Sequence, residues 1–472
     1  MTFSKSGSGK STKKARAIFV CTACGNSSAQ WLGRCPTCQA WDSLVEERVD
    51  TRAHAMGSAS SNVAGDWTKP TLLGDVPADS TVRISTGLEE LDRVLGGGVV
   101  LGSIVLLGGD PGIGKSTLLM QALAGMAAMG RTVLYASGEE SAAQIALRGR
   151  RLDLKGIDRV LVQATTELEE LEAAIDALKP SVVVVDSIQT LRSRELESGA
   201  GSVGQLREVA ARLVEFAKRR SIAFFLIGHV TKDGALAGPK LLEHLVDTVL
   251  SIEGDATHSP RIVRASKNRF GPAHELAIFE MVQDGLREVP DPSTHFLAER
   301  PKNVAGSVVV PICEGARSML IEVQALVAPA LYGQARRVSS GIEGSRLAIL
   351  LAVIERKADV HVLDRDVFAS VAGGARIEER AADLALCVAI VSSLRNRAVG
   401  ADVAVFGEVG LAGELRAVPR APQRVAEARK LGFRRIVMPM SNAMQLTPAE
   451  TADVTILGAR TLADALGDAL SN

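Results

Sequence analysis

Net charge, aromatic residues and long apolar runs are all scarce in this chain. The 54 basic and 54 acidic side chains among 472 residues cancel. This balance excludes a uniformly basic nucleic-acid binder, but not a protein whose basic residues gather on one surface. Three Trp, two Tyr and eleven Phe leave little material for rows of rings that stack on bases. No apolar run approaches the roughly 20 residues of a membrane helix, so we expect no membrane partner.

The N-terminus is polar and basic and lacks the apolar stretch of a secretory signal. A cytoplasmic location is therefore expected, where disulfides are rare. Hydrophobic residues make up 46% of the chain, enough to bury sizeable cores, and the length suggests about three domains.

Four of the six cysteines form two Cys-x-x-Cys pairs separated by ten residues. Paired knuckles supply four thiolates for tetrahedral zinc, and so short a segment takes most of its folding free energy from the metal. The sequence therefore predicts a structural zinc site at Cys21, Cys24, Cys35 and Cys38. Trp31, Trp41 and Arg34 flank this site and either contact a partner or cover the knuckles. Cys313 and Cys387 are expected to be buried small hydrophobes.

After an Ala/Ser/Gly/Thr-rich stretch, strand-like and helix-like patterns alternate. Strands are expected at 103–107, 132–136, 181–185 and 223–227, and helices at 117–128, 167–178 and 205–219. Such alternation is typical of a mostly parallel α/β sheet covered on both faces. Beyond a proline-rich break the pattern is α/β again, with strands near Val308, Leu320, Val403 and Ile436 and a long apolar helix at 380–394.

A phosphate-binding loop is predicted between the first of these strands and its helix, where the sequence fits G-x4-G-K-S. Glycines let backbone N–H groups approach phosphates at a helix N-terminus. Lys115 is expected to reach the β- and γ-phosphates, and Ser116 to ligate Mg²⁺. The predicted nucleotide-binding residues are Gly109, Asp110, Pro111, Gly112, Ile113, Gly114, Lys115, Ser116 and Thr117.

Acidic residues end two further strands. Asp186 follows four valines and suits a carboxylate in the Mg²⁺ shell. Glu139 and Glu140 follow the strand at 132–136, where one of them could polarise the attacking water. Both also precede a helical pattern, where the helix dipole favours anions. We favour Glu139 as the base and place Glu140 on the helix cap.

The segment Ile84-Ser-Thr-Gly-Leu-Glu-Glu-Leu-Asp92, the phosphate loop and the acidic strand ends resemble the RecA-type recombinase and hexameric-helicase ATPase core. With the four cysteines and Lys267-Asn-Arg-Phe-Gly271, nearly the whole chain closely resembles the RadA (Sms) family of bacterial DNA repair proteins. The resemblance implies that Glu139 is the catalytic glutamate and that His229 senses the γ-phosphate.

The same resemblance implies an oligomer. Lys267 and Arg269 alternate on an expected strand and so share one face. In related rings such a pair reaches the γ-phosphate of the neighbouring subunit, so Lys267 and Arg269 are expected to act catalytically in trans. Without the resemblance, the two side chains would be read as a solvated basic strand edge.

Two polar, Gly-rich segments, 191–204 and 231–238, follow core strands. In RecA-like rings the corresponding loops grip single-stranded DNA, which makes Arg192, Arg194 and Lys232 candidate phosphate contacts. A flexible surface loop is an equally good interpretation from the sequence alone.

The segments around 389–394 and 401–413 resemble the Lon protease domain. A Lon-like peptidase needs a Ser nucleophile activated by Lys. The serine position falls on Ala381 and the lysine position on Pro422 or Gln423, none of which can do this chemistry. We therefore expect a scaffold without proteolytic activity. Its basic residues are a hypothetical contact for duplex DNA: Arg376, Arg380, Arg395 and Arg397.

The expected fold is α/β, with a four-cysteine zinc ribbon and basic arm at 1–48, a linker at 49–70, a RecA-like ATPase core at 71–288 and an inactive Lon-like domain at 289–472.

The expected function is a DNA-dependent ATPase, a ring helicase or translocase on single-stranded DNA that promotes branch migration in repair. Its cofactors would be ATP, Mg²⁺ and structural Zn²⁺. Expected partners are single-stranded and branched DNA, further copies in a hexameric ring, a recombinase and a replicative helicase, in a nucleoid-associated cytoplasmic setting. An ATP-dependent protease and a non-translocating ATP-switch scaffold are the alternatives.

Overall fold

The computed structural model describes residues 16–21, 27–28, 30–36, 39, 41, 43–49, 72, 82–228, 241–254, 260–273, 275–315, 317–330 and 335–471. These residues form two compact units. Unit 1 contains the described residues up to Ile252, with Ala265–Gly271 and Gln283–Gly285, and unit 2 contains Glu253–Arg264, Pro272–Val282 and the remainder from Leu286. The chain passes between the units several times, and the predicted domain limits at 48, 70 and 288 stay predictions.

The N-terminal segment forms a small antiparallel sheet of strands β1 (Arg16–Cys21), β2 (Ser27–Ser28) and β3 (Leu44–Val49), in the order β2-β1-β3. Cys21, Cys35 and Leu44 are buried together, with Phe19 packed against them. Among the side chains described in this segment, the apolar cluster is small, which fits a fold that depends on a metal.

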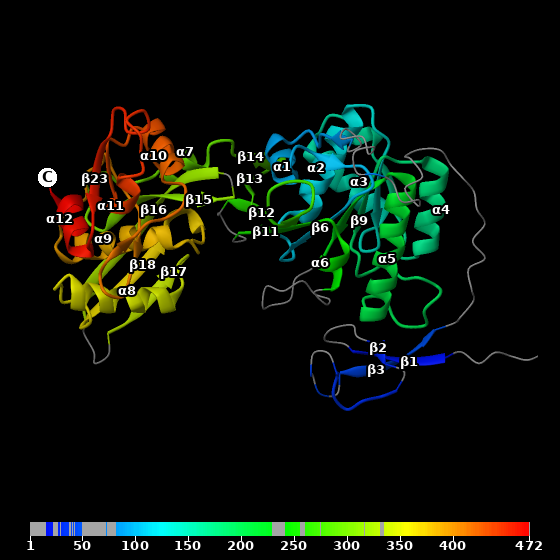
Figure 1. The fold of residues 1–472 in the computed structure, drawn as a ribbon. Coiled ribbons are helices and arrows are strands. Elements are labelled where there is room, and N and C mark those ends of the chain that lie inside the picture. The colour runs from blue at the N-terminus through cyan, green and yellow to red at the C-terminus, as the bar shows by residue number, and fades with distance from the viewer. Residues whose placement is uncertain are drawn as a thin grey trace, which may run out of the picture. The chain divides into compact units, whose positions relative to one another are not determined.

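The centre of unit 1 is a parallel sheet (Figure 1). Its strands follow the order β11-β6-β10-β9-β7-β8, and each neighbouring pair is parallel. The bounds are β6 Ile104–Gly109, β7 Val133–Ser137, β8 Leu161–Ala164, β9 Val182–Asp186, β10 Ala223–Ile227 and β11 Thr248–Glu253. The four predicted strands are confirmed to within two residues. Because the strands are parallel, their carboxyl ends lie at one edge.

Helices cover both faces of this sheet (Figure 1). Strand residues such as Ile104, Leu106 and Val183 share one core with the apolar sides of α4 and α5, while α2 packs on strands β6, β9 and β10. Buried on both faces, the strands need no alternation of polar and apolar residues. The helices are α1 Glu89–Leu95, α2 Lys115–Ala128, α3 Ala142–Leu152, α4 Leu168–Leu178, α5 Val203–Arg220 and α6 Leu241–Leu245.

The segment before α1 is held by one carboxylate. Asp92 accepts hydrogen bonds from the Ser85 hydroxyl at 2.6 Å, the Thr86 N–H at 2.8 Å and the Thr86 hydroxyl at 2.7 Å. It lies between two short paired strands, β4 (Arg83–Ile84) and β5 (Val99–Val100). The first motif of the ATPase resemblance therefore has a local folding role.

Beyond β11, the chain forms β12 (Arg261–Asn268), β13 (Leu276–Val282) and β14 (Gly285–Glu288), of which β12 and β13 pair antiparallel. Leu276 and Ile278 of β13 belong to the apolar core of unit 2.

Unit 2 is built on a seven-stranded sheet in the order β17-β18-β16-β15-β19-β22-β23. Helix α9 is buried along almost its whole length and packs on β15 and β16 with α8 and α12 beside it, while α7 and α10 pack from the other side (Figure 1). The larger strands are β15 Ser307–Glu314, β16 Arg317–Pro329, β17 Arg337–Ser340, β18 Arg365–Val371, β19 Val403–Val405, β22 Arg435–Pro439 and β23 Thr455–Ala459. Two short strands, β20 Glu408–Val409 and β21 Leu415–Arg416, pair separately. The helices are α7 Pro292–Leu297, α8 Gly344–Lys357, α9 Asp383–Leu394, α10 Ala421–Lys430, α11 Met440–Ala443 and α12 Leu462–Leu470.

A fully buried arginine joins α10 to this sheet. Arg424 donates to both carboxylate oxygens of Glu379, one of them at 3.0 Å. It also donates to the carbonyl oxygens of Pro311 at 2.6 Å and Pro419 at 3.1 Å. Because each guanidinium nitrogen donates at least one hydrogen bond and Glu379 supplies the opposite charge, the buried charge is compensated.

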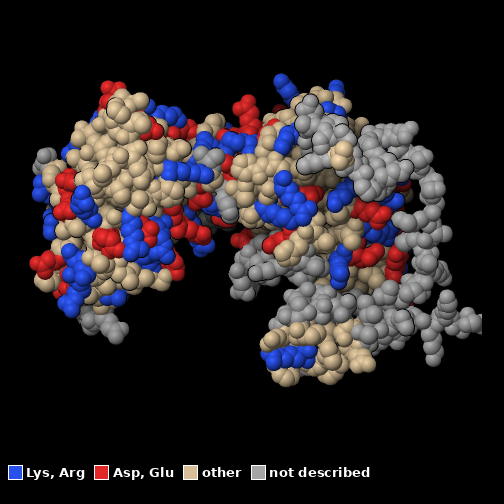
Figure 2. Space-filling model, in the orientation of Figure 1, with Lys and Arg blue, Asp and Glu red and all other residues tan. Residues whose placement is uncertain are grey.

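Within the described residues, no helix has the length and apolar character needed to cross a bilayer. Basic and acidic side chains are intermixed on the visible faces of both units (Figure 2), in keeping with their equal totals.

Candidate functional site

The loop between β6 and α2 has the backbone of a phosphate cradle. Gly112 and Gly114 have φ angles of 76° and 116°, in the left-handed region that favours glycine. A Cβ added at Gly112 would meet no atom within 4 Å, so open space lies beside the loop. Helix α2 begins at Lys115, directly after this turn, and its N-terminal N–H groups have no partner within the helix. The loop therefore fits an anionic ligand.

Lys115 lies buried under this loop. Its ammonium donates to the carbonyl oxygens of Gly109 at 2.7 Å and Asp110 at 2.9 Å. Burial lowers the pKa of Lys115, while the negative charges of Asp186, Asp110 and Glu139 oppose this shift. The lysine and both predicted acids are thus within electrostatic reach of one another at the same edge of the sheet.

Asp186 is the last residue of β9 and is buried. It accepts a short hydrogen bond from the hydroxyl of Tyr135 on the neighbouring strand β7. Burial and the adjacent carboxylate raise the pKa of Tyr135 well above its usual range, so the phenol stays protonated at neutral pH. Together with the partly buried Ser116, Asp186 supplies the oxygen ligands that Mg²⁺ prefers, so these residues fit the predicted magnesium site.

The two glutamates after β7 have different partners. Glu139 is exposed and accepts a hydrogen bond of 2.6 Å from the hydroxyl of Ser187, the residue after Asp186. Glu140 pairs with Arg148 at 2.8 Å. The interpretation of Glu140 as a helix cap was wrong, because Ser141 caps α3 in a capping box with Gln144.

Lys267 and Arg269 do not share a strand face, which corrects the prediction for this pair. Strand β12 ends at Asn268, whose side-chain oxygen accepts the N–H of Phe270 at 2.9 Å and turns the chain. Lys267 donates at 2.7 Å to the carbonyl oxygens of Glu243 and Val246, at the end of α6. Burial, and next the positive charge of Arg269, lower the pKa of Lys267.

Arg269 is half-exposed and pairs with Asp247 at 3.2 Å. Both cations of the predicted trans-acting pair are therefore held by their own chain. His229, the predicted γ-phosphate sensor, lies outside the described residues.

The two described arginines of the predicted DNA loop are already paired with acids. Arg192 and Arg194 both contact Glu167, at 2.5 and 3.0 Å, and Arg194 also pairs with Glu170 at 2.9 Å. Glu167 and Glu170 line a cavity of about 450 Å³ that Glu139 also lines. The third predicted contact, Lys232, lies outside the described residues.

Two of the four predicted zinc ligands can be placed. Cys21 and Cys35 are buried in one cluster, whereas Cys24 and Cys38 lie outside the described residues. Among the side chains that the structure describes, no group of three or more ligand residues occurs. Trp31 and Trp41 are 56% and 72% exposed, and Arg34 stacks over Trp41 at 5.4 Å, so these rings do not form an interior.

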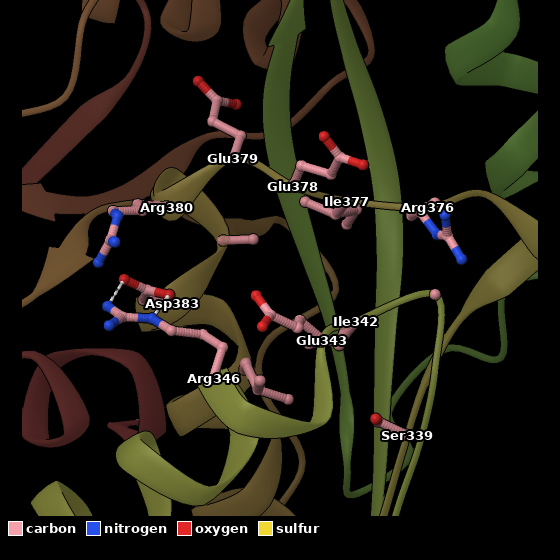
Figure 3. Close-up of a pocket in the computed structure, with 13 residues that line it drawn as sticks. Ser339, Ile342, Glu343, Arg346, Arg376, Ile377, Glu378, Glu379, Arg380 and Asp383 are labelled. Atoms are coloured by element: carbon pink, nitrogen blue, oxygen red, sulfur yellow. Dashed lines mark hydrogen bonds and ion pairs between the residues drawn. The ribbon is translucent and has the colours of Figure 1, made fainter. Parts of the chain in front are cut away.

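Unit 2 has a charged cavity of about 580 Å³ beside the position where the Lon resemblance requires a nucleophile (Figure 3). Arg346 and Asp383 pair at its wall, and Arg376 and Arg380 line it. Burial raises the pKa of Asp383, opposed by the pairing with Arg346. Ala381, at the serine position, is buried and has no reactive group.

The other arginines and cysteines of unit 2 are placed as follows. Arg395 and Arg397 are exposed after α9. Cys387 is buried as predicted, but Cys313 is only partly buried, which corrects that prediction.

Sequence reasoning missed Tyr135 and Arg148. The only available signal was a tyrosine inside an otherwise apolar strand, since a buried hydroxyl needs a hydrogen-bond partner.

Three family models match this chain. Residues 19–46 match a rubredoxin metal binding domain, residues 69–235 an AAA domain and residues 342–442 the subunit ChlI of Mg-chelatase. The predicted order of zinc ribbon, RecA-like ATPase core and Lon-like C-terminal domain is thereby confirmed. A KaiC-like protein from Pyrococcus horikoshii is similar over 44% of this chain and all of its own, at 19% identity and a TM-score of 0.38.

Relatives match almost end to end. The DNA repair protein RadA of Halalkalibacterium halodurans is 47% identical and covers 96% of this chain and 98% of its own. The RadA protein of Pseudomonas aeruginosa is also 47% identical, over 96% of this chain and 99% of its own. The RadA protein of Bacillus subtilis is 44% identical, over 97% of this chain and 99% of its own. The chain carries an AAA-type ATPase domain, and it belongs to the RadA family of DNA repair proteins.

Proposed function

We propose that this protein is a DNA-dependent ATPase that assembles as a ring on single-stranded DNA and promotes branch migration of recombination intermediates. The observation that carries the proposal is the convergence of Lys115, Glu139 and Asp186 at the carboxyl edge of one parallel sheet, where Lys115 follows β6, Asp186 ends β9 and Glu139 is hydrogen-bonded to the adjoining Ser187. Phosphate loop, acidic strand end and water-orienting carboxylate are the parts that phosphoryl transfer to water requires.

Each residue has a separate task in hydrolysis. The N–H groups around Gly112 to Ser116 bind the phosphates, and Lys115 exchanges its two carbonyl partners for phosphate oxygens. Ser116 and Asp186 would hold Mg²⁺, which would supply charge neutralisation at the transferring phosphoryl group. Glu139, oriented by Ser187, accepts the proton of the attacking water.

Lys267 and Arg269 complete the site of a neighbouring subunit in this proposal. In this chain Lys267 donates to carbonyl oxygens near α6 and Arg269 pairs with Asp247. In the ring, a phosphate of the neighbouring subunit would compete with these contacts. Hydrolysis then needs an oligomer, for which we propose a closed ring, with His229 sensing the γ-phosphate.

DNA binding is proposed to use Arg192, Arg194 and Lys232, with a recombinase and a replicative helicase as protein partners. The name of the related proteins, DNA repair protein RadA, supports a DNA substrate. The zinc ribbon is proposed to bind structural zinc through its four cysteines. The C-terminal domain is proposed to lack peptidase activity, because Ala381, Pro422 and Gln423 stand where the dyad is required.

The test measures ATP turnover against added single-stranded and forked DNA. We expect stimulation by DNA, and we expect that mixing in Arg269→Ala lowers the turnover of wild-type subunits, because each finger serves a neighbour. Turnover that DNA leaves unchanged would favour the ATP-switch alternative. Degradation of casein with ATP would favour the protease.

A further inference from the structure

Strand β7 has five residues, of which only Tyr135 and the final Ser137 have polar side chains. It is fully buried and stands opposite Val184 of β9, two residues before Asp186. A tyrosine costs more than a phenylalanine at such a place unless its hydroxyl is hydrogen-bonded. Packing alone therefore does not account for the choice of residue.

The partners of the Tyr135 hydroxyl define which way its hydrogen points. Arg148 of α3 donates to the phenolic oxygen at 2.8 Å, and its guanidinium lies 5.6 Å from the ring centroid. Arginine has donors only, so the tyrosine must accept from it. The hydroxyl hydrogen is then left for Asp186, which accepts it.

The hydroxyl of Ser116, the second residue proposed to hold Mg²⁺, lies close enough to Tyr135 to oppose the rise in the pKa of the tyrosine. Arg148 in turn is anchored by Glu140 at 2.8 Å. One hydrogen-bonded chain thus runs from Glu140 through Arg148 and Tyr135 to Asp186.

We propose that Tyr135 is a positioning residue, which fixes the carboxylate of Asp186 for Mg²⁺ and is itself oriented by Arg148. This proposal rests on the proposed ATPase function. By holding one carboxylate oxygen of Asp186, Tyr135 leaves the other oxygen for the metal shell. Outer-shell hydrogen bonds of this kind commonly change metal affinity by about 10- to 100-fold.

Tyr135→Phe is the sharpest variant because it keeps the ring and removes only the hydroxyl. We expect Mn²⁺, used as a paramagnetic substitute for Mg²⁺, to bind the full-length protein–ADP complex about tenfold more weakly, as measured by electron paramagnetic resonance. The affinity for ADP in the presence of EDTA should stay unchanged, since the phosphate loop is untouched. A loss of packing alone would change both affinities or neither.

Arg148→Gln should also weaken Mn²⁺ binding, and it provides the test if Tyr135→Phe does not fold. Arg150→Gln is the matched control, an exposed arginine on the same helix, and should bind Mn²⁺ as the wild type does. Unchanged Mn²⁺ affinity in folded Tyr135→Phe, or in Arg148→Gln if the former does not fold, overturns the proposal. Failure of the ATPase function is a separate result: the wild type itself would show no Mg²⁺-dependent hydrolysis.

Discussion

Replacing Glu139 with Gln should nearly abolish ATP hydrolysis while leaving ATP binding intact. The amide keeps the size of the side chain and can still accept the 2.6 Å hydrogen bond from Ser187. It cannot accept a proton from water, and losing a general base costs about 10²- to 10⁴-fold in turnover. Because the Glu139 side chain is exposed, this substitution should leave the fold unchanged.

The turnover of variants at two neighbouring residues, Ser187 and Glu140, provides the comparison. Ser187→Ala removes a hydrogen bond to a carboxylate, and we expect turnover to fall at least about tenfold because such bonds contribute about 1.5–3 kcal/mol. Glu140→Gln keeps an oxygen that accepts a hydrogen bond from Arg148 and loses only the charge of a partly exposed pair, so turnover should fall less than about threefold.

Steady-state ATP hydrolysis with saturating single-stranded DNA measures these differences, and calorimetry with a non-hydrolysable ATP analogue measures binding. The order of loss should be Glu139→Gln, then Ser187→Ala, then Glu140→Gln. If Glu140→Gln loses orders of magnitude while Glu139→Gln keeps most of its turnover, the assignment of the base is refuted.

Three further predictions concern DNA, stability and metal. Glu167→Gln should tighten single-stranded DNA binding, because Arg192 and Arg194 lose a carboxylate that competes with DNA phosphates. Fluorescence anisotropy measures this affinity, and the control Glu215→Gln, which removes an exposed carboxylate on α5, should leave it unchanged. Arg424→Met should lower the free energy of unfolding in urea by about 3 kcal/mol, because Glu379 loses its buried partner; an equally stable variant would contradict this. Zinc removal by a chelator, followed with a metal-sensitive dye, should unfold the β2-β1-β3 sheet alone.

The parts of this protein that the sequence predicted are local ones. The phosphate loop was found because strand, glycines, lysine and helix are contiguous between residues 104 and 128. The parallel strands were found because burial on both faces makes each a short, continuous apolar run.

What could not be predicted depends on partners distant in the chain. Tyr135 and Asp186 are separated by 51 positions, and no periodicity indicates that their side chains meet. Arg269 was misplaced because the strand pattern continues past Asn268, while the Asn side chain ends the strand. Glu140 was misassigned because helix-start chemistry allows either an acid or Ser141 as the cap.

The interleaving of the two units between residues 253 and 286 bears on how the protein can be dissected. A fragment ending at residue 288 would carry Glu253–Arg264 and Pro272–Val282 away from the unit to which they belong. Leu276 and Ile278 would then be cut off from the core that buries them, leaving apolar surface prone to aggregate. Point substitutions in the full-length chain are therefore better suited than truncations to separate ATP hydrolysis from whatever the C-terminal half contributes.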